Sequence, residues 1–229
     1  MLCFARNGIF GSFTNDSFIL VYKTVDIHDN IYKKLKPDSP LLYELWEPQG
    51  IAVVIGYSQQ ASVEANLPAC RADGVPVIRR RGGGGAVVLL PGVLCLTTAF
   101  MSQASESPYY FFKKINQLLI EILQDRLGVR ELSYRGISDI AIGGHKILGC
   151  SIFKSRNTYF YQGSLLVNAD LRRIAYYLRH PSKEPDYRNG RQHNDFLTTL
   201  EKSGYHFTVE KVKKVLTGEI AKQLCQVVL

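Results

Sequence analysis

The sequence predicts an α+β fold in which a mixed β-sheet is flanked by helices. Short β-prone runs outnumber the helical stretches and do not alternate strictly with them, which argues against a regular βαβ chain. Two long stretches, residues 107–128 and 208–228, carry apolar residues at helical spacing, so each should bury one face. A length of 229 residues and a hydrophobic content of 46% fit one large globular domain.

The first half of the chain is predicted to place strands around a glycine-rich turn. Its β-prone runs are LLYELW, IAVVIG, VPVIRR and GAVVLL, at residues 41–46, 51–56, 75–80 and 85–90. Between the second and third of these runs, residues 61–72 have helical character, and Gly74 would end that helix.

The helix predicted at residues 107–128 has the clearest boundary signals. Ser107 stands at the N-cap, Pro108 lies in the first turn, and Gly128 ends the helix. The residues that form its apolar face are Phe112, Ile115, Leu119, Ile122 and Leu123. We expect this face to lie in the core.

A hairpin is predicted over residues 138–153, where two β-rich arms flank Gly143 and Gly144. Glycine adopts the positive φ angles that a two-residue hairpin turn requires. Lys146 lies just past this turn.

The C-terminal part of the chain alternates structured and polar stretches. In order, it holds a strand, a helix, a polar stretch and an amphipathic helix, at residues 158–167, 169–178, 179–195 and 208–228. The apolar residues of the last helix are Val212, Val215, Leu216, Ile220 and Leu224. Their spacing favours core packing over membrane contact. The polar stretch is a candidate boundary between a main domain and a C-terminal segment.

The charge and cysteine content limit the partners and the compartment. A formal net charge of +8 at pH 7 favours an anionic ligand or an acidic protein partner. Outside residues 79–81 the cations are scattered, so we expect no nucleic acid partner. Five cysteines without CxxC or metal-like spacing indicate reduced thiols. The longest apolar stretch, residues 86–100, is interrupted by Pro91 and Gly92, so we expect a cytoplasmic protein without a signal peptide or membrane span.

Residues 79–92, RRRGGGGAVVLLPG, place three arginines beside four glycines. Backbone N–H groups of such a loop can point at an anion, and arginine side chains add forked donors. The stretch is not a Walker A loop, because no lysine followed by serine or threonine closes it. The glycine spacing and the missing helix exclude a dinucleotide fingerprint. On the pattern alone, a bare turn between two strands is an equal alternative.

Lys146 is the second candidate for anion binding. A lysine within a β-rich arm is poorly placed for solubility if that arm lies inside a sheet, and a bound anion would explain it. The alternative is a charge that protects an edge strand. Asp139, on the preceding arm, is placed to pair with Lys146 or to hold a metal ion or a ribose near it.

Three sequence blocks, considered together, point to a family. They are LWEPQGIAVVIGYSQQ, RRRGGGGAVVLLPG, and SDIAIGGHKILGCSIF with its continuation YQGSLLVNADL, within residues 41–171. Their order and separation resemble the lipoate-protein ligase A family of the biotin/lipoate ligase superfamily. The resemblance implies a class II synthetase-like fold and a single catalytic domain over residues 1–229. In this reading, residues 41–171 are the family core and residues 196–229 are a C-terminal helical segment.

The resemblance also implies a reaction. Ligases of this family join lipoate to ATP, with Mg²⁺, to give lipoyl-AMP, and then pass the acyl group to a lysine of a lipoyl domain. Octanoate is the alternative acid. The implied acceptor is an acidic lipoyl-domain protein of the dehydrogenase E2 or glycine cleavage H type. Acyl carrier protein and a separate accessory domain are further candidate partners.

The site residues follow from the same resemblance. Lys146 matches the lysine that contacts the activated acyl group and its phosphate, where an ammonium offsets growing negative charge. The positions that match substrate-binding residues are Trp46, Arg80, Gly83, Gly84, Gly85, Asp139, Gly149 and Gln162. No metal bound directly by the protein is expected.

Three positions depart from the family pattern. Leu89 and Gln162 stand where the family usually has histidines, and Ser138 stands where it has an asparagine. The residues before about 40 match the family poorly, and few residues follow Arg179, where many ligases carry an accessory domain. Adenylation by a separate protein therefore stays open.

Two alternative functions remain open. An octanoyltransferase would need a cysteine nucleophile, and the stretches RELSYRGIS and RHPSKEP, where that family carries it, contain none. Cys150 follows the GxKxxG motif and is expected to pack rather than react. A non-catalytic paralogue is the second alternative, because Leu89 and Gln162 replace polar pocket residues.

Overall fold

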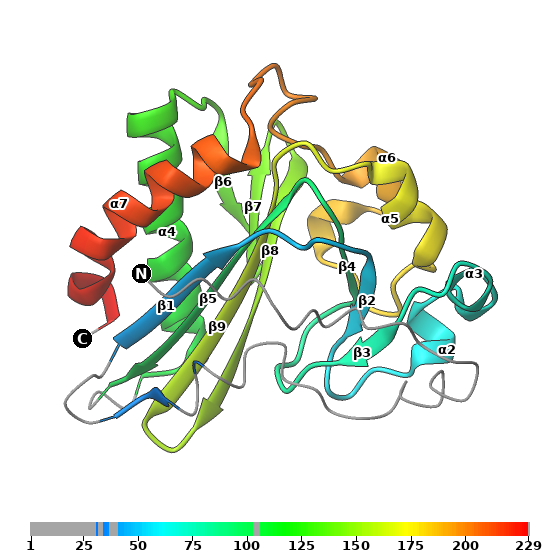
Figure 1. Cartoon of the computed structure of the whole chain (residues 1–229), viewed down its shortest axis with the longest axis horizontal. Helices are drawn as coiled ribbons and strands as arrows, with labels where there is room; N and C mark the ends of the chain where they lie inside the picture. Colours follow the sequence, from blue (N-terminus) through cyan, green and yellow to red (C-terminus); the bar gives the residue numbers. More distant parts are fainter. Residues whose placement is uncertain (1–30, 32–33, 37–40, 103–105, 229) are drawn as a thin grey trace.

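The computed structural model describes residues 31, 34–36, 41–102 and 106–228. Two β-sheets lie side by side, the larger one with two long helices and the smaller one with several short helices (Figure 1). The predicted α+β class is confirmed. The single sheet expected from the sequence is instead divided into two, because strand partners lie far apart along the chain and cannot be read from local patterns.

The larger sheet has six strands in the order β1-β5-β9-β8-β7-β6, and its pairs are antiparallel. Its strands are β1 (Leu41–Trp46), β5 (Val93–Met101), β9 (Thr158–Leu166), β8 (His145–Ser155), β7 (Asp139–Ile142) and β6 (Leu132–Arg135). The hairpin predicted around Gly143 and Gly144 is confirmed: both have positive φ, and Ile142 pairs with His145.

The smaller sheet has the strand order β3-β2-β4 and is the mixed one, since it contains both a parallel and an antiparallel pair. Strand β2 (Ala52–Ile55) pairs parallel with β3 (Val77–Arg79) and antiparallel with β4 (Val87–Leu89). Its apolar residues form a second core cluster with α2 (Ala61–Glu64), α3 (Leu67–Ala72) and α5 (Leu171–Tyr177), which also includes residues of β5 and β9.

The predicted helix at residues 61–72 is divided into α2 and α3. Asn66 and Pro68 explain the division, since Asn66 caps α3 through Oδ1, which accepts from the Ala69 N–H at 3.5 Å, and Pro68 lies in the first turn. Ala65, between the helices, is extended and forms an isolated bridge with Leu178. This bridge ties the helices to the end of α5.

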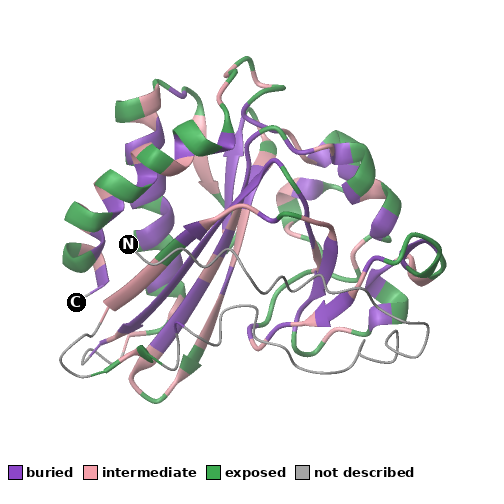
Figure 2. Ribbon diagram, in the orientation of Figure 1, coloured by how far each residue is buried: buried purple, intermediate pink, exposed green. Residues whose placement is uncertain are grey.

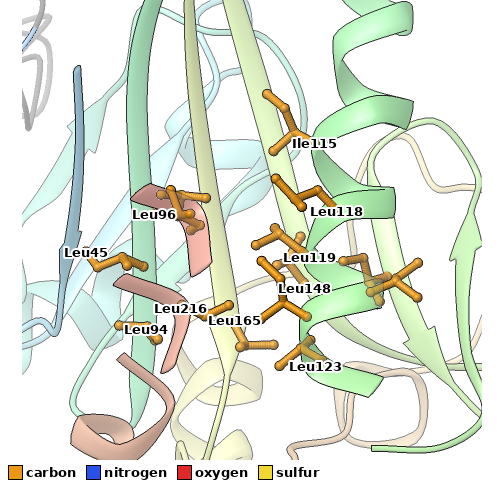
Figure 3. Close-up of a cluster of buried hydrophobic side chains, with 14 of the residues drawn as sticks. Leu45, Leu94, Leu96, Ile115, Leu118, Leu119, Leu123, Leu148, Leu165 and Leu216 are labelled. Atoms are coloured by element: carbon orange, nitrogen blue, oxygen red, sulfur yellow. The ribbon is translucent and has the colours of Figure 1, made fainter. Parts of the chain in front are cut away.

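The helices α4 (Pro108–Leu127) and α7 (Val209–Val228) cover one face of the larger sheet (Figure 1). The predicted boundaries of α4 are confirmed, with Ser107 at the N-cap and Gly128 in the left-handed conformation at the C-cap. Both helices turn their buried sides inward (Figure 2). Leucines of the sheet and of both helices meet there (Figure 3), which places α7 in the main core.

The two sheets are joined at Gly92. A Cβ at this position would stand 2.7 Å from Cα of Ala169, so only glycine allows the approach. The Gly92 N–H donates to Oε1 of Glu47 at 2.8 Å, and the Gly92 carbonyl accepts from the backbone of Val167 at 3.0 Å.

The polar stretch at residues 179–195 packs on the protein instead of forming an extended linker. It contains the short 3-10 helix η2 (Asp186–Arg188) and the start of α6 (His193–Phe196). Most of the residues before about 40, for which a poor match to the family was expected, lie outside the described part of the chain.

Candidate active site

A cavity of about 110 Å³ lies between the two sheets. Its apolar lining residues are Trp46, Val54, Ala86, Val87, Leu89 and Cys95. Its polar side chains include Thr97, Ser138, Lys146, Ser151, Gln162 and Ser164. The indole N–H of Trp46 lies 3.4 Å from Oγ1 of Thr97, which fixes the ring edge against the sheet. An elongated apolar molecule with one charged end suits such a lining.

An ion pair between neighbouring strands supplies one of the charged groups of the cavity. Nζ of Lys146, on β8, lies 2.8 Å from Oδ1 of Asp139, on β7. The carboxylate is nearly buried, with 5% side-chain exposure, whereas the lysine side chain keeps 25%. Asp139 also accepts from the Tyr187 hydroxyl at 2.8 Å, and the Ser138 hydroxyl lies 3.3 Å away. The carboxylate is therefore held from several sides while the ammonium faces the cavity.

A bulge in β8 explains why Lys146 and Gly149 share the cavity face. In a regular strand, residues three apart point to opposite faces. Here Ala141 pairs with Lys146, but the preceding Ile140 pairs with Leu148, so Ile147 is an extra residue. The bulge turns Ile147 and Leu148 into the helix-side core and returns Gly149 to the cavity side.

Gly149 gives the lysine side chain room to lie along the strand. A Cβ at Gly149 would stand 2.6 Å from Nζ and 2.7 Å from Cε of Lys146. No real Cβ tolerates such distances, so the lysine would have to move away from Asp139. This contact gives the GxKxxG motif a direct physical reason.

Arg80 organises the glycine-rich loop from within. Its guanidinium donates to the carbonyl of Gly83 at 2.6 Å and to that of Gly85 at 2.7 Å, and it lies 3.5 Å from the carbonyl of Val54. Burial lowers the pKa of Arg80 to about 10, so the group stays charged at neutral pH. The predicted forked donors thus hold the loop itself, and Arg80 also borders the cavity.

The neighbouring loop at Gly56 is pressed against the glycine-rich loop. A Cβ at Gly56 would stand 2.2 Å from the carbonyl oxygen of Gly84. Arg79 secures this contact, because Nη1 donates to the carbonyls of Tyr57 and Gln59, each at 2.6 Å. Arg79 and Arg80 therefore each hold one of the two loops.

Cys150 lies at the cavity but is not an activated thiol. Burial raises its pKa to about 12. Its Sγ lies 3.0 Å from the carbonyl of Ser138 and accepts from the amide nitrogen of Asn116 at 3.4 Å. The amide oxygen of Asn116 accepts from the Tyr161 hydroxyl at 2.8 Å. This buried network supports the packing role expected from the sequence.

The structure brings together most of the predicted site residues. Those that line the cavity are Trp46, Arg80, Gly84, Gly85, Lys146, Gly149 and Gln162. Two predicted residues do not line it: Gly83 contributes a carbonyl to Arg80, and Asp139 stands behind Lys146. The edge-strand alternative for Lys146 is wrong, because β8 lies between β7 and β9.

The residues that depart from the family pattern, Leu89, Gln162 and Ser138, all line the cavity. The sequence reasoning missed Tyr187 and Gly56. Tyr187 lies in the polar stretch and meets Asp139 across 48 residues, a distance no local pattern reveals. Gly56 ends a β-prone run before a polar turn, which was a signal for a close backbone approach.

The fold and the cavity together define a class: a two-sheet α+β domain in which a lysine paired with a buried aspartate and a glycine-rich loop line one ligand cavity. Its sequence matches the family described as "Lipoyl protein ligase A/B catalytic domain" over residues 21–221. The chain belongs to this family, as the blocks around Arg80 and Lys146 led us to expect.

Curated relatives carry the name lipoate-protein ligase A. The chain is 31% identical over 166 residues to the protein of Blochmanniella floridana, which covers 70% of this chain and 46% of that protein. It is 34% identical over 156 residues to the protein of Psychrobacter cryohalolentis, covering 68% of this chain and 43% of that protein. The matched region thus spans less than half the length of these relatives.

Solved structures confirm the fold. A bipartite lipoate protein ligase of Thermoplasma acidophilum, studied with its E2 lipoyl domain, superposes with a TM-score of 0.74 at 20% identity, over 92% of this chain and 80% of that one. A lipoate-protein ligase A bound with ATP superposes with a TM-score of 0.73 at 21% identity, over 92% and 81% of the chains. A putative lipoate protein ligase of T. acidophilum with bound lipoic acid superposes with a TM-score of 0.71 at 20% identity. The superposition covers 92% of this chain and 82% of that one.

The described residues lack two features that would point to a membrane or a bound metal ion. No helix among them combines the length and apolar character needed to cross a membrane. Over the same ranges, no three His, Cys, Asp or Glu side chains gather as a metal site would require.

Proposed function

We propose that this chain is the catalytic part of a lipoate-protein ligase, which activates lipoate or octanoate as an acyl-adenylate and passes it to a lysine of a lipoyl domain. The observation that carries the proposal is the ammonium of Lys146, held 2.8 Å from Asp139 at a largely apolar cavity that the glycine-rich loop also lines. Family membership and the lipoate-protein ligase names of the relatives support it.

The first step is adenylation. The acyl chain would lie among the apolar residues, with Trp46 as one wall and its carboxylate near Lys146. A carboxylate oxygen attacks the α-phosphorus of ATP, and the bond to the β-phosphate breaks as pyrophosphate leaves with the electron pair. The Lys146 ammonium has three N–H donors, one of which meets Asp139, so the others can stabilise the developing charge on the acyl and phosphate oxygens.

The second step is acyl transfer. A neutral lysine amine of the lipoyl domain attacks the acyl carbonyl, and the bond to the AMP oxygen breaks. AMP leaves as the amine loses a proton to water. Lys146 stabilises the oxyanion of the tetrahedral intermediate without giving up its own proton.

Mg²⁺ is proposed as a companion of ATP. Among the described residues no three His, Cys, Asp or Glu side chains gather, so a resident ion would lack a ready set of protein ligands. The backbone of Gly84 and Gly85, which lines the cavity, would instead receive the nucleotide.

The acceptor is proposed to be an acidic lipoyl domain of the dehydrogenase E2 or glycine cleavage H type. The net charge of +8 would speed the encounter with such a partner. The T. acidophilum ligase was solved in a study that includes its E2 lipoyl domain, which supports this kind of partner. A cytoplasmic location and a separate accessory chain belong to the same proposal.

The test supplies apo lipoyl domain with three donors in separate reactions: lipoate with ATP and Mg²⁺, prepared lipoyl-AMP, and octanoyl carrier protein. Intact-mass spectrometry reports acylation of the acceptor, and an acceptor whose target lysine is replaced by arginine is the control. We expect modification with lipoate plus ATP and with lipoyl-AMP.

Each other pattern leads to a definite conclusion. Modification from lipoyl-AMP alone assigns transfer to this chain and adenylation to another component. Modification from the carrier protein alone establishes an ATP-independent transferase. If no donor modifies the acceptor, the chain is a non-catalytic paralogue, as Leu89 and Gln162 would then explain.

A further inference from the structure

The polar stretch that follows α5 contains a segment whose purpose the proposed function does not explain. This segment, residues 186–198, is called the clasp here; it comprises η2, α6 and the residues around them. It contacts the hairpin that carries Asp139 and Lys146, although it lies about 40 residues or more further along the chain.

The clasp is attached to this hairpin at three points. The Tyr187 hydroxyl donates to Oδ2 of Asp139 at 2.8 Å. Arg191 donates through Nη2 to the carbonyl of Gly144 in the hairpin turn at 3.1 Å. The Thr198 N–H donates to the backbone carbonyl of Lys146 at 3.0 Å. The side-chain partner of the lysine, its backbone and the adjacent turn are thus all held by one segment.

The clasp is rigid enough to serve as a support. The ring of Phe196 is 2% exposed and lies under two guanidiniums, with Arg188 4.8 Å and Arg191 5.2 Å from its centroid. Arg191 also donates to the Tyr187 carbonyl at 2.8 Å. The tyrosine ring packs on Phe196 with centroids 5.1 Å apart. These contacts fix the tyrosine from its backbone to its ring.

We propose that Tyr187 is a positioning residue for Lys146, and that the clasp fixes the direction of the lysine ammonium. The two oxygens of Asp139 have separate partners, Tyr187 on Oδ2 and Lys146 on Oδ1. With Oδ2 fixed, the carboxylate cannot rotate about χ2, so Oδ1 keeps the ammonium at one place on the cavity wall. Without the hydroxyl, the carboxylate and the lysine sample more orientations.

The state of Tyr187 agrees with this role. Burial and the nearby Asp139 charge raise the pKa of its hydroxyl, so it carries its proton at neutral pH and acts as a donor. A hydrogen bond to a carboxylate is stronger than one between neutral groups.

The test compares Tyr187→Phe with Tyr177→Phe, a closely matched control. The Tyr177 hydroxyl also donates to an aspartate, Oδ2 of Asp73, at the same 2.8 Å, and neither of these residues lines the cavity. Side-chain NMR relaxation of ¹³Cε-labelled lysine, with the Lys146 signal assigned through Lys146→Arg, measures the order of the lysine in the ligand-free protein. Steady-state adenylation and thermal unfolding are measured on the same samples.

We expect Tyr187→Phe to lower the Lys146 order parameter and to lower kcat about tenfold, with KM for the acid nearly unchanged. Tyr177→Phe should change neither, while both variants should lose similar thermal stability. A merely structural role would move stability alone.

The kinetic part of this inference rests on the proposed function, but the relaxation measurement does not. If wild type shows no acyl transfer from any donor, the proposed function fails while the Lys146 order parameter still decides the role of Tyr187. An unchanged order parameter in Tyr187→Phe, or an equal change in Tyr177→Phe, overturns the positioning role even in an active enzyme.

Discussion

Gly149 lies directly beneath the side chain of Lys146, with room for a hydrogen atom and no more. A methyl group there would stand 2.6 Å from the lysine Nζ, closer than nonbonded carbon and nitrogen atoms approach. The position of the Lys146 ammonium beside Asp139 therefore depends on glycine at residue 149.

Gly149→Ala should therefore displace the ammonium and lower acyl transfer at least about tenfold, whereas the free energy of unfolding changes by only about 1 to 3 kcal/mol. Gly218→Ala is the matched control, because a Cβ there meets nothing within 4 Å and the residue lies within α7. That change should stabilise the protein by about 0.5 to 1 kcal/mol. Urea unfolding and the mass assay check both. Full activity in Gly149→Ala would show that the lysine finds another productive position.

Lys146→Ala should reduce acylation at least about 100-fold, because it removes the charge that stabilises the developing oxyanion. The protein should stay folded, since Asp139 keeps its hydrogen bond from Tyr187. We expect a stability loss of about 1 to 3 kcal/mol. Lys154→Ala, on the same strand but in an exposed contact with Glu106, is the control. Retained activity would exclude Lys146 from a catalytic role.

His193 should make stability depend on pH below neutrality. It is 8% exposed, and burial together with Arg188 lowers its pKa from 6.5 to about 4. Between pH 6.5 and about 4, His193 binds a proton in the unfolded chain but stays neutral in the folded chain. The free energy of unfolding therefore falls as the pH drops through this range. In His193→Gln, about 2 kcal/mol of the loss between pH 7 and pH 4.5 should disappear.

Urea unfolding at the two pH values measures this effect, with His206→Gln, at an exposed position, as the control. The control should lose as much stability as wild type. An equal loss in His193→Gln would show that other groups cause the acid sensitivity.

The labelling rate of Cys150 should distinguish an adenylate mechanism from one that uses a cysteine thioester. At pH 8 iodoacetamide should modify exposed Cys225 quickly and leave Cys150 unmodified, because a pKa of about 12 leaves roughly one thiolate in ten thousand. Peptide mapping by mass spectrometry before and after denaturation gives the rates. Labelling of Cys150 as fast as Cys225 would support a cysteine nucleophile.

Local sequence signals were sufficient to predict those features that are determined by residues close together in the chain. The paired glycines 143 and 144 predicted the hairpin, and Ser107, Pro108 and Gly128 predicted the limits of α4. The division between α2 and α3 at residues 65–66 could also have been predicted from the sequence, since Asn66 before Pro68 is a helix-start signal. The helical character of residues 61–72, taken with Gly74 as the end, led to the prediction of one helix instead of two.

Long-range relationships could not be predicted in this way. The division into two sheets depends on which strands pair, and the contact of Tyr187 with Asp139 depends on how the polar stretch folds back. For the site, composition and spacing singled out the arginine–glycine run and Lys146. The resemblance to a known family added Trp46 and Gln162, which no spacing rule would have selected.

The extra residue in β8 adds a buried side chain to the core without changing the face on which its paired neighbours lie. Ile147 is fully buried, and exchange for another aliphatic side chain of similar size would leave the path of the backbone intact. Loss of this single residue would leave Lys146 and Gly149 two positions apart, so regular alternation would keep both on the cavity face, and the damage would fall on the packing of the core. In descendants of this gene, a deletion at this point would therefore lower the stability of the fold before it moved the amine of Lys146.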